Sequence, residues 1–404
     1  MNQRDFSPIT VRGCIAAALS LFLGCQSYAA PSDQQQVAAA NNNFTFNLLQ
    51  QLASEQPGSN VFISAYSAAT DLQMLSVGAE SNTKGEMEDA LGIAGLPSLV
   101  LYEGNRALNS IINAKNPNYD LTTANAIWYR VGTPLVPSFV SVNRNYFRAK
   151  EEGLNFNSPN SAAIINAWAS QATHGKINKI VQWPISSDVR LFLNNAVYFL
   201  GSWQNPFDTN LTAQGTFTLS GGGQAVVPLM HQTDFFGYRE GSNYQVVRLP
   251  YKGNKLAMYV FLPNEGSTPQ DLLNSMNGTW WGQARTSGFP QAQGMVALPK
   301  FNLNYTASLV PALQALGMES AFTQEANFSG LSPQPLSVAD VKQQAVVQVD
   351  EKGTLAAAVT TITVIATVAP PPPSFEMIVN RPFLFFIQDE QAGSILFSGA
   401  VFNP

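Results

Sequence analysis

The chain of 404 residues contains only two histidines, His174 and His231, and this limits the covalent chemistry that it can perform. A serine hydrolase needs a histidine base beside its nucleophile, and neither histidine lies in a recognisable catalytic motif. The sequence has no Gly-x-Ser-x-Gly elbow, no His-Glu-x-x-His pair, no Walker loop and no Gly-x-Gly-x-x-Gly turn. We therefore expect no enzyme activity, no cofactor and no metal site. His174 is typical of a turn at a helix end, and His231 of a strand-loop segment.

Both cysteines, Cys14 and Cys25, lie in the first thirty residues, which have the features of an export signal. A weakly basic start precedes a short apolar core at 15–24, and a small-x-small cleavage site ends at Ala29. Cleavage there would leave a mature chain without thiols, which excludes cysteine catalysis, thiolate metal sites and disulfides. We expect residues 1–29 to be a signal peptide and the protein to be periplasmic or secreted. The alternative is a lipoprotein anchored through Cys25.

Composition narrows the possible partners. Hydrophobic residues make up 45% of the chain and charged residues 12%, and the formal net charge is −5. The nearest approach to a basic cluster is Arg144, Arg148 and Lys150, which fits a solvated face. We therefore expect no binding to nucleic acid.

One stretch has an unusual pattern for a loop. The acidic and basic residues of 349–352 are followed by an uncharged run of small and β-branched residues to Ala369, and prolines 370–373 end it. Val, Ile and Thr favour extended backbone, and alternation would put Thr354, Ala356, Ala358 and Thr360 on one face. The run therefore predicts a loop with the composition of a strand.

The rest of the chain supplies the elements that would position this stretch. Residues 30–40 are expected to be a polar spacer, and helical spacing begins at Asn41. Ser67 is expected to cap a second helix, and Thr83 with Glu86 to form the capping box of a third. Apolar runs predict strands at 61–64, 122–129, 190–199, 256–262, 296–298, 383–387 and 394–402. Asn194 and Asn195 interrupt one strand and predict a buried polar network. We expect one α+β domain over 41–404.

Several of these stretches, in this order, resemble the serpin family. The most specific matches are Ile165-Asn166-Ala167-Trp168, Thr173-His174-Gly175-Lys176-Ile177, Asn195-Ala196-Val197-Tyr198-Phe199 with Gly201 and Trp203, Leu298-Pro299-Lys300-Phe301, and Asn380-Arg381-Pro382-Phe383. The resemblance implies three β-sheets, about nine helices and an exposed reactive-centre loop at about 353–374. It also implies inhibition of serine proteases by a suicide mechanism, in which the cleaved loop inserts into the central sheet.

The resemblance also assigns the candidate site residues. The hinge of the loop corresponds to Glu351, Gly353, Thr354, Ala356, Ala357 and Ala358. Counting sixteen residues from Glu351, as in most inhibitory members, places the reactive bond at Thr367–Val368, with Ala366–Thr367 and Val368–Ala369 as alternatives. These side chains are small or β-branched and uncharged. The expected target is an elastase-like or subtilisin-like serine protease, with a papain-like cysteine protease as the less favoured option.

The region where the sheet opens is expected to contain Ser64, Ser67, Asn195, Trp203 and Gln343. Gln343 stands where many family members have a histidine, so we expect little pH sensitivity of this region between about pH 5 and 8. Leu355 and Val359 depart from the usual hinge pattern. No basic helix face suggests a heparin-type activator, and we expect a monomer. The alternative function is that of a non-inhibitory serpin-fold carrier whose loop is cleaved without trapping a protease.

Overall fold

The computed structural model describes residues 31–354 and 373–404. The compact unit that contains these elements spans Ser32–Pro404. The expected signal peptide, the hinge alanines Ala356, Ala357 and Ala358, and the reactive-bond candidates Ala366, Thr367, Val368 and Ala369 lie outside the described residues. Within the described ranges, no helix is both long and apolar enough to cross a membrane.

Nine α-helices are present in the described part of the chain, in agreement with the expected number. They are α1 (Asp33–Glu55), α2 (Ala65–Ser76), α3 (Ser81–Ala90), α4 (Ser98–Ile112), α5 (Pro137–Tyr146), α6 (Pro159–Ala172), α7 (Pro269–Ser275), α8 (Gly278–Thr286) and α9 (Val310–Ala315). Two 3₁₀ turns, at Thr209–Leu211 and Ser320–Phe322, complete the helical elements.

The first helix begins earlier than the sequence pattern predicts. We expected a polar spacer up to residue 40, but α1 starts at Asp33 because Ser32 and Gln35 form a capping box. Val37, Ala38 and Ala40 are buried on its inner face, so the first turns are part of the core. The prediction of a polar spacer is therefore corrected: residues 33–40 form the first turns of α1.

The predicted caps of the next two helices are also wrong. Ser64, not Ser67, is the N-cap of α2, and its side chain accepts a hydrogen bond from the Ser67 backbone N–H. The third helix begins at Ser81, so Thr83 and Glu86 lie inside it. Glu86 accepts hydrogen bonds from the backbone N–H groups of residues 319 and 320 instead. These side chains tie helices to distant segments, which local spacing alone does not reveal.

Six strands form the first sheet. Their order is β10 (Phe301–Ser308), β11 (Lys342–Asp350), β12 (Gly353–Thr354), β4 (Leu191–Ser202), β2 (Tyr119–Arg130) and β3 (Lys150–Leu154). The β2–β3 pair is parallel and the other four pairs are antiparallel. Because β12 is antiparallel to both of its neighbours, β4 and β11 run parallel to each other on either side of it.

The second sheet has nine strands and joins two sheets that the resemblance implied were separate. Its order is β1 (Val61–Ile63), β15 (Ser394–Val401), β14 (Phe383–Asp389), β8 (Leu256–Pro263), β7 (Tyr244–Pro250), β6 (Gln224–Glu240), β9 (Gln291–Pro299) and β13 (Phe375–Ile378), with β5 (Ala213–Thr218) paired to β6. The long strand β6 pairs with β9 over most of its length and with β7 near its end. The α+β class is thus confirmed. The described ladders form two continuous sheets, because β6 pairs with β7 on one side and with β9 on the other and so joins the two groups of strands.

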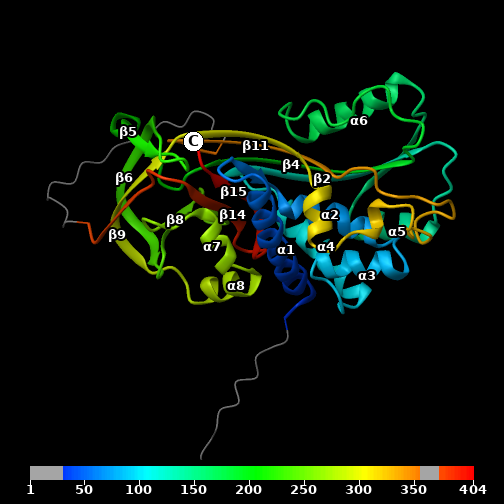
Figure 1. The fold of residues 1–404 in the computed structure, drawn as a ribbon, viewed down its shortest axis with the longest axis horizontal. Coiled ribbons are helices and arrows are strands. Elements are labelled where there is room, and N and C mark those ends of the chain that lie inside the picture. The colour runs from blue at the N-terminus through cyan, green and yellow to red at the C-terminus, as the bar shows by residue number, and fades with distance from the viewer. Residues whose placement is uncertain (1–30, 355–372) are drawn as a thin grey trace, which may run out of the picture. The chain divides into compact units, whose positions relative to one another are not determined.

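Helix α2 lies between the two sheets and contacts β4 of one and β15 of the other. Figure 1 shows α6 on the opposite side of β2 and β4 from α2. A large apolar cluster fills the interior, and a smaller one, including Trp128, Phe156 and Ile165, lies between α6 and the six-stranded sheet. The part of the six-stranded sheet near β2 and β4 is therefore covered on both faces, whereas buried and exposed residues alternate along β10.

Candidate functional site

The two residues of β12 form a short strand between β4 and β11. Gly353 and Thr354 pair with Ser202 and Gly201 on one side and with Asp350 and Val349 on the other. Beyond β12, no backbone ladder pairs β4 with β11 among the described residues. We call this boundary, between residues 191–200 of β4 and 342–348 of β11, the seam. The hinge predicted from the sequence thus enters the sheet at one end of the seam.

Glycine is required at position 353. Its φ of +151° lies in a region that other residues rarely adopt, and a Cβ atom there would lie 2.0 Å from the carbonyl oxygen of Gly201. No side chain can be accommodated at that distance. The close approach of Gly353 to β4 therefore depends on the absence of a side chain.

Thr354 points into the interior of the protein. Its side chain is only 2% exposed, and its hydroxyl lies 2.7 Å from the hydroxyl of Tyr251. Burial raises the pKa of Tyr251, so this phenol remains protonated and can donate. Since side chains alternate along a strand, the face that Thr354 would share with Ala356 and Ala358 is the inward one.

Trp203 secures the hinge by two hydrogen bonds to backbone oxygens. Its backbone N–H donates to Lys352 over 2.9 Å and its indole N–H to Asp350 over 3.0 Å. The indole stacks on the ring of Tyr251, with centroids 4.6 Å apart. Trp203, which the sequence analysis assigned to the region where the sheet opens, therefore lies beside the hinge.

The hinge carboxylate is buried and paired. Glu351 accepts hydrogen bonds from the ammonium of Lys300 over 2.9 Å and from the hydroxyl of Thr212 over 2.8 Å. Burial alone would raise the pKa of Glu351, but the hydrogen bonds from these partners outweigh it and lower the pKa. We call Trp203, Tyr251, Lys300 and Glu351 the hinge anchor.

A second polar group connects the two sides of the seam through the start of α2. Gln343 of β11 donates to the carbonyl oxygen of Ser64 over 2.7 Å, and the Ser64 hydroxyl donates to Leu396 of β15 over 2.8 Å. On the other side, the Ser67 hydroxyl donates to the side-chain oxygen of Asn195 in β4. We call Ser64, Ser67, Asn195 and Gln343 the α2 bridge. The structure thus brings together four residues that the sequence assigned to one region.

Two members of this network were missed by the sequence reasoning. Asn195 donates its amide to Asn125 of β2, which in turn donates to the carbonyl oxygen of Phe147. Asp71 of α2 accepts a hydrogen bond from the backbone N–H of Asn195 over 3.1 Å. A buried asparagine in an apolar strand and a lone acid in an otherwise uncharged helix were the available signals. Asn194, which we expected in the same network, has a buried side-chain oxygen without a hydrogen-bond partner among the described residues.

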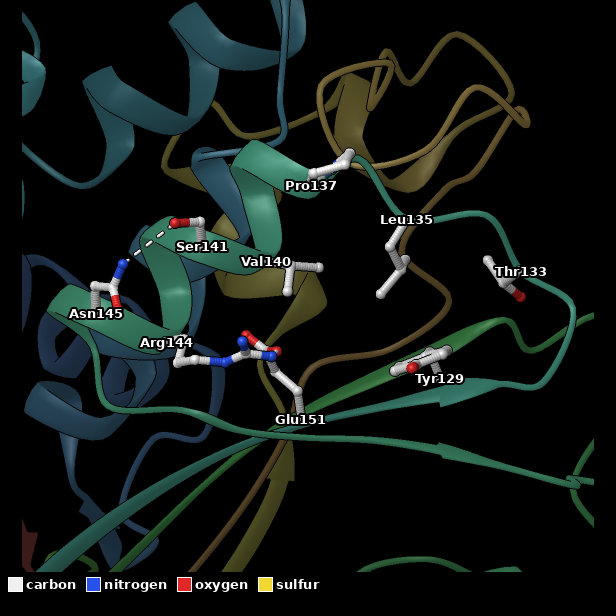
Figure 2. Close-up of a pocket in the computed structure, with 9 residues that line it drawn as sticks. All are labelled: Tyr129, Thr133, Leu135, Pro137, Val140, Ser141, Arg144, Asn145 and Glu151. Carbon is white, nitrogen blue, oxygen red and sulfur yellow. Dashed lines mark hydrogen bonds and ion pairs between the residues drawn. The ribbon is translucent and has the colours of Figure 1, made fainter.

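A cavity of about 550 Å³ lies away from these residues, between α5, β3 and the end of β2 (Figure 2). Its lining residues are Tyr129, Thr133, Leu135, Pro137, Val140, Ser141, Arg144, Asn145 and Glu151. The side chains of Arg144 and Glu151 point toward each other and form an ion pair of 2.5 Å. Tyr129 pairs with Leu191, at the end of β4 opposite the hinge. None of the hinge or sheet-opening residues that lie in the described part of the chain lines this cavity.

The histidines occupy ordinary structural positions. His174 lies in the turn after α6, as expected, with its Nε2 atom 3.2 Å from a carboxylate oxygen of Asp120. His231 lies within β6, and its Nδ1 atom is 3.1 Å from each of two backbone oxygens. In the ranges 31–354 and 373–404, no group of three or more His, Cys, Asp or Glu residues is arranged to hold a metal ion.

Comparison with known proteins gives one family. The family model described as "Serpin (serine protease inhibitor)" matches residues 39–404. An uncharacterized serpin-like protein from Methanosarcina acetivorans is 34% identical over 377 residues, which cover 92% of this chain and 87% of that protein. The leukocyte elastase inhibitor of Bos taurus is 31% identical over 384 residues, which cover 92% of this chain and all of the relative.

Solved structures give the same fold. The thermophilic serpin tengpin in its native state matches with a TM-score of 0.83 and 27% identity, covering 93% of this chain and 96% of that one. Human thyroxine-binding globulin in complex with thyroxine matches with a TM-score of 0.81 and 26% identity, covering 92% of this chain and all of the other.

Proposed function

Because this chain belongs to the serpin family, we propose that it is a suicide-substrate inhibitor of serine endopeptidases with an elastase-like or subtilisin-like target. In this proposal the protease cleaves the reactive-centre loop, roughly residues 353–374, and remains attached to it as an acyl-enzyme. The loop then enters the six-stranded sheet as a new strand between β4 and β11. The chain itself is a substrate that traps the enzyme, not a catalyst.

The arrangement of β12 is the observation that carries this proposal. Gly353 and Thr354 already have the antiparallel pairing that a longer inserted strand would continue, and the seam beyond them has no ladder among the described residues. Continued pairing would satisfy backbone groups on both sides of a new strand.

Loop insertion supplies a large driving force. A strand of about fifteen residues gains about 1 kcal/mol net per hydrogen bond and about 25 cal/mol per Å² of buried apolar surface. The total is on the order of ten or more kcal/mol, enough to distort an attached protease. The form without insertion must then be kept by a kinetic barrier. The hinge anchor and the α2 bridge are the contacts that lie along the path of insertion.

The covalent step follows from the candidate bond. The serine hydroxyl of the protease attacks the carbonyl carbon of Thr367 and loses its proton to the protease's own base. The bond to the nitrogen of Val368 breaks, and that nitrogen takes up the proton as the new amino terminus. The C-terminal fragment released would comprise residues 368–404. An ester between the protease serine and Thr367 remains.

The nature of the target is proposed from the loop and from a relative. The candidate residues on either side of the bond, Thr367 and Val368, are uncharged and β-branched, which suits a shallow apolar specificity pocket and not a trypsin-like one. The similarity to the bovine leukocyte elastase inhibitor supports the same class of target. A papain-like cysteine protease is the second candidate.

A non-inhibitory binding protein is the alternative, since the fold also matches thyroxine-binding globulin. In that case cleavage of the loop would release both fragments without a covalent adduct.

The two functions are separated by one incubation. The protein without residues 1–29 is mixed with an elastase-like and with a subtilisin-like protease, and the products are analysed under denaturing conditions. The proposal predicts an adduct that survives denaturation and a released peptide that begins at Val368, or at Thr367 or Ala369 for the alternative bonds. Complete cleavage without any adduct would support the carrier function instead. A catalytically inactive serine-to-alanine protease is the control and should give no adduct.

We also propose that the protein acts after export, as a monomer and without a nucleic-acid partner or a heparin-type activator. The first residue of the exported protein tests the route. A start at Ala30 supports the signal peptide, and a lipid-modified Cys25 supports the anchored form.

A further inference from the structure

Asp71 is the only charged residue of α2, and it faces β4. One carboxylate oxygen, Oδ2, accepts the hydrogen bond from the backbone N–H of Asn195 over 3.1 Å. The other, Oδ1, is buried and has no hydrogen-bond partner among the described residues. A helix side chain thus satisfies a strand backbone group that a neighbouring strand would normally satisfy.

The N–H of Asn195 points into the seam. Backbone groups of successive strand residues point to opposite sides, and the register of β4 against β2 is uninterrupted from Leu191 to Gly201. The backbone N–H of Trp203, an odd-numbered residue, donates to the carbonyl oxygen of Lys352 on the side of the hinge. The carbonyl oxygen of Arg190, an even-numbered residue, accepts from the backbone N–H of Arg130 on the side of β2. The backbone N–H and C=O groups of odd-numbered residues of β4 therefore point into the seam, and Asn195 is one of these residues.

Continuing the register of β12 identifies the backbone group of the inserted loop that would take over the hydrogen bond now accepted by Asp71. Thr354 pairs with Gly201, so six further residues along an antiparallel strand would bring Thr360 opposite Asn195. The Trp203–Lys352 hydrogen bond belongs to the same set of directly opposed, hydrogen-bonded positions. In the inserted form, the N–H of Asn195 would therefore donate to the carbonyl oxygen of Thr360.

We propose that the Asp71 carboxyl group is a proton-controlled latch on the seam, which holds the Asn195 N–H until the loop strand takes that hydrogen bond. The proposal rests on the loop insertion of the proposed function and adds a regulatory residue to it. Insertion must break the Asp71–Asn195 contact and leave the carboxyl group under the new strand.

The protonation state of Asp71 then matters. Burial raises the pKa of Asp71 to about 8, and the hydrogen bond from Asn195 offsets part of this effect. Insertion removes that hydrogen bond, so the pKa of Asp71 is higher still in the inserted form. Below about pH 8 both forms carry the proton and insertion does not depend on pH. Above it, the ionised carboxylate holds Asn195 more strongly, and insertion must take up a proton.

The other ionisable groups around α2 do not account for titration near this pH. The neighbouring elements are α1, α3, α4, α5, β4 and β15, with β11 across the seam. Their titratable residues, with Tyr66 of α2 itself, are Asp33, Glu55, Lys84, Glu86, Glu88, Asp89, Tyr102, Glu103, Arg106, Arg144, Tyr146, Tyr198, Lys342 and Asp350; β15 has none. No hydrogen bond or ion pair joins any of these to Asp71 within the described residues. Burial raises the pKa of Tyr66 and of Tyr198 above the usual value, so neither phenol loses its proton near pH 8.

The loop itself allows a clean test, because residues 354–369 contain no ionisable side chain. A synthetic peptide of this sequence, blocked at both ends, is added to the uncleaved protein, and its rate of incorporation is followed from pH 6 to 9.5. A single group with a pKa of about 8 predicts a fall of about tenfold between pH 7 and pH 9. Asp71→Asn keeps an acceptor but not the titration, so its rate should be constant over this range.

Two further variants complete the experiment. Asp71→Ala removes the latch, and its rate should be independent of pH and faster than that of the parent at pH 9. Glu325→Gln, at an exposed position, should behave like the parent. A tenfold fall that persists in Asp71→Asn, or a parent rate that does not change with pH, would overturn the latch. If these results occur while protease adducts still form, the proposed function stands; if no adduct forms and no peptide is incorporated at any pH, both proposals fail.

Discussion

The ion pair between Lys300 and the buried carboxylate of Glu351 shows how single side chains hold the hinge in place. The Glu351 side chain is 9% exposed, whereas that of Lys300 is 37% exposed and partly solvated. The pair joins the start of β10 to the turn before β12 and so holds the hinge against the sheet. Its contribution is limited by the solvation of the ammonium group.

Replacement of Lys300 by Met should destabilise the protein by about 1–2 kcal/mol at pH 7, because the Glu351 carboxylate then remains buried without its main donor. In the parent, the lowered pKa of Glu351 contributes stability above the unfolded pKa, and this contribution is lost as the pH falls through the folded pKa. The deficit of the variant should therefore shrink below about pH 4. Thermal unfolding of the parent and the variant at a series of pH values measures this difference in stability. Lys115→Met, at an exposed position, serves as the control, and an equal deficit in both would contradict the role of the pair.

Thr354 carries a second prediction at the scale of one residue. Thr354→Arg should convert the inhibitor into a substrate, because a guanidinium on the inward face has no partner beside Tyr251 and opposes insertion. The ratio of covalent adduct to cleaved product after protease treatment measures the effect. Thr354→Ser keeps the hydroxyl and should retain most of the adduct. Equal trapping by the arginine variant would show that this face does not enter the core.

The elements differ in how far the sequence predicts them. Strand runs such as 122–129, 190–199 and 256–262 correspond to β2, β4 and β8, because β-branched and aromatic residues between turn residues are a local signal. The caps were not predicted correctly, since Ser32 and Ser64 compete with other small polar residues nearby and only the folded chain decides between them.

The polar contacts of the seam depend on pairs that are distant in the sequence. Asn195 and Gln343 were assigned from the family resemblance, and in the structure they hydrogen-bond to Ser67 and Ser64 at the start of α2. Asp71 could not, because its partner is the backbone of a strand more than a hundred residues later. The expectation of little pH sensitivity between about 5 and 8 rested on Gln343 alone. The proposed latch at Asp71 would add a pH dependence of loop insertion that begins near the upper end of that range.

At the scale of elements, β12 depends on the close approach of Gly353 to Gly201. Gly353→Ala should break this pairing, because a Cβ atom would lie 2.0 Å from the Gly201 oxygen. The backbone N–H of Trp203, which donates to Lys352, should then exchange with solvent about tenfold faster, as expected for the loss of one hydrogen bond. Gly221→Ala is a matched control, because a Cβ atom there meets nothing within 4 Å. Unchanged exchange at Trp203 would mean that β12 tolerates a side chain.

For the whole molecule, the two sheets and α2 form a connected system. One end of α2 is bonded to both flanks of the seam and to β15 of the other sheet, so a strand that enters the seam must rearrange contacts of both sheets. The hinge anchor lies at the entrance and the α2 bridge further along the path. Under the proposed mechanism, entry of the loop would be opposed in stages, which agrees with a form that is kept by a kinetic barrier.

The central claim is that the cleaved loop becomes a strand between β4 and β11 in the register that β12 begins. Thr354 pairs with Val349, so four more residues bring Ala358 opposite Ala345, at a position where antiparallel side chains approach closely. Cysteines are introduced at both alanines in a chain without Cys14 and Cys25, and disulfide formation is measured before and after cleavage of the loop. The claim predicts a disulfide only after cleavage, and none when Ala357 replaces Ala358 as the second site. A bond in the intact protein, no bond after cleavage, or preference for Ala357 would contradict it.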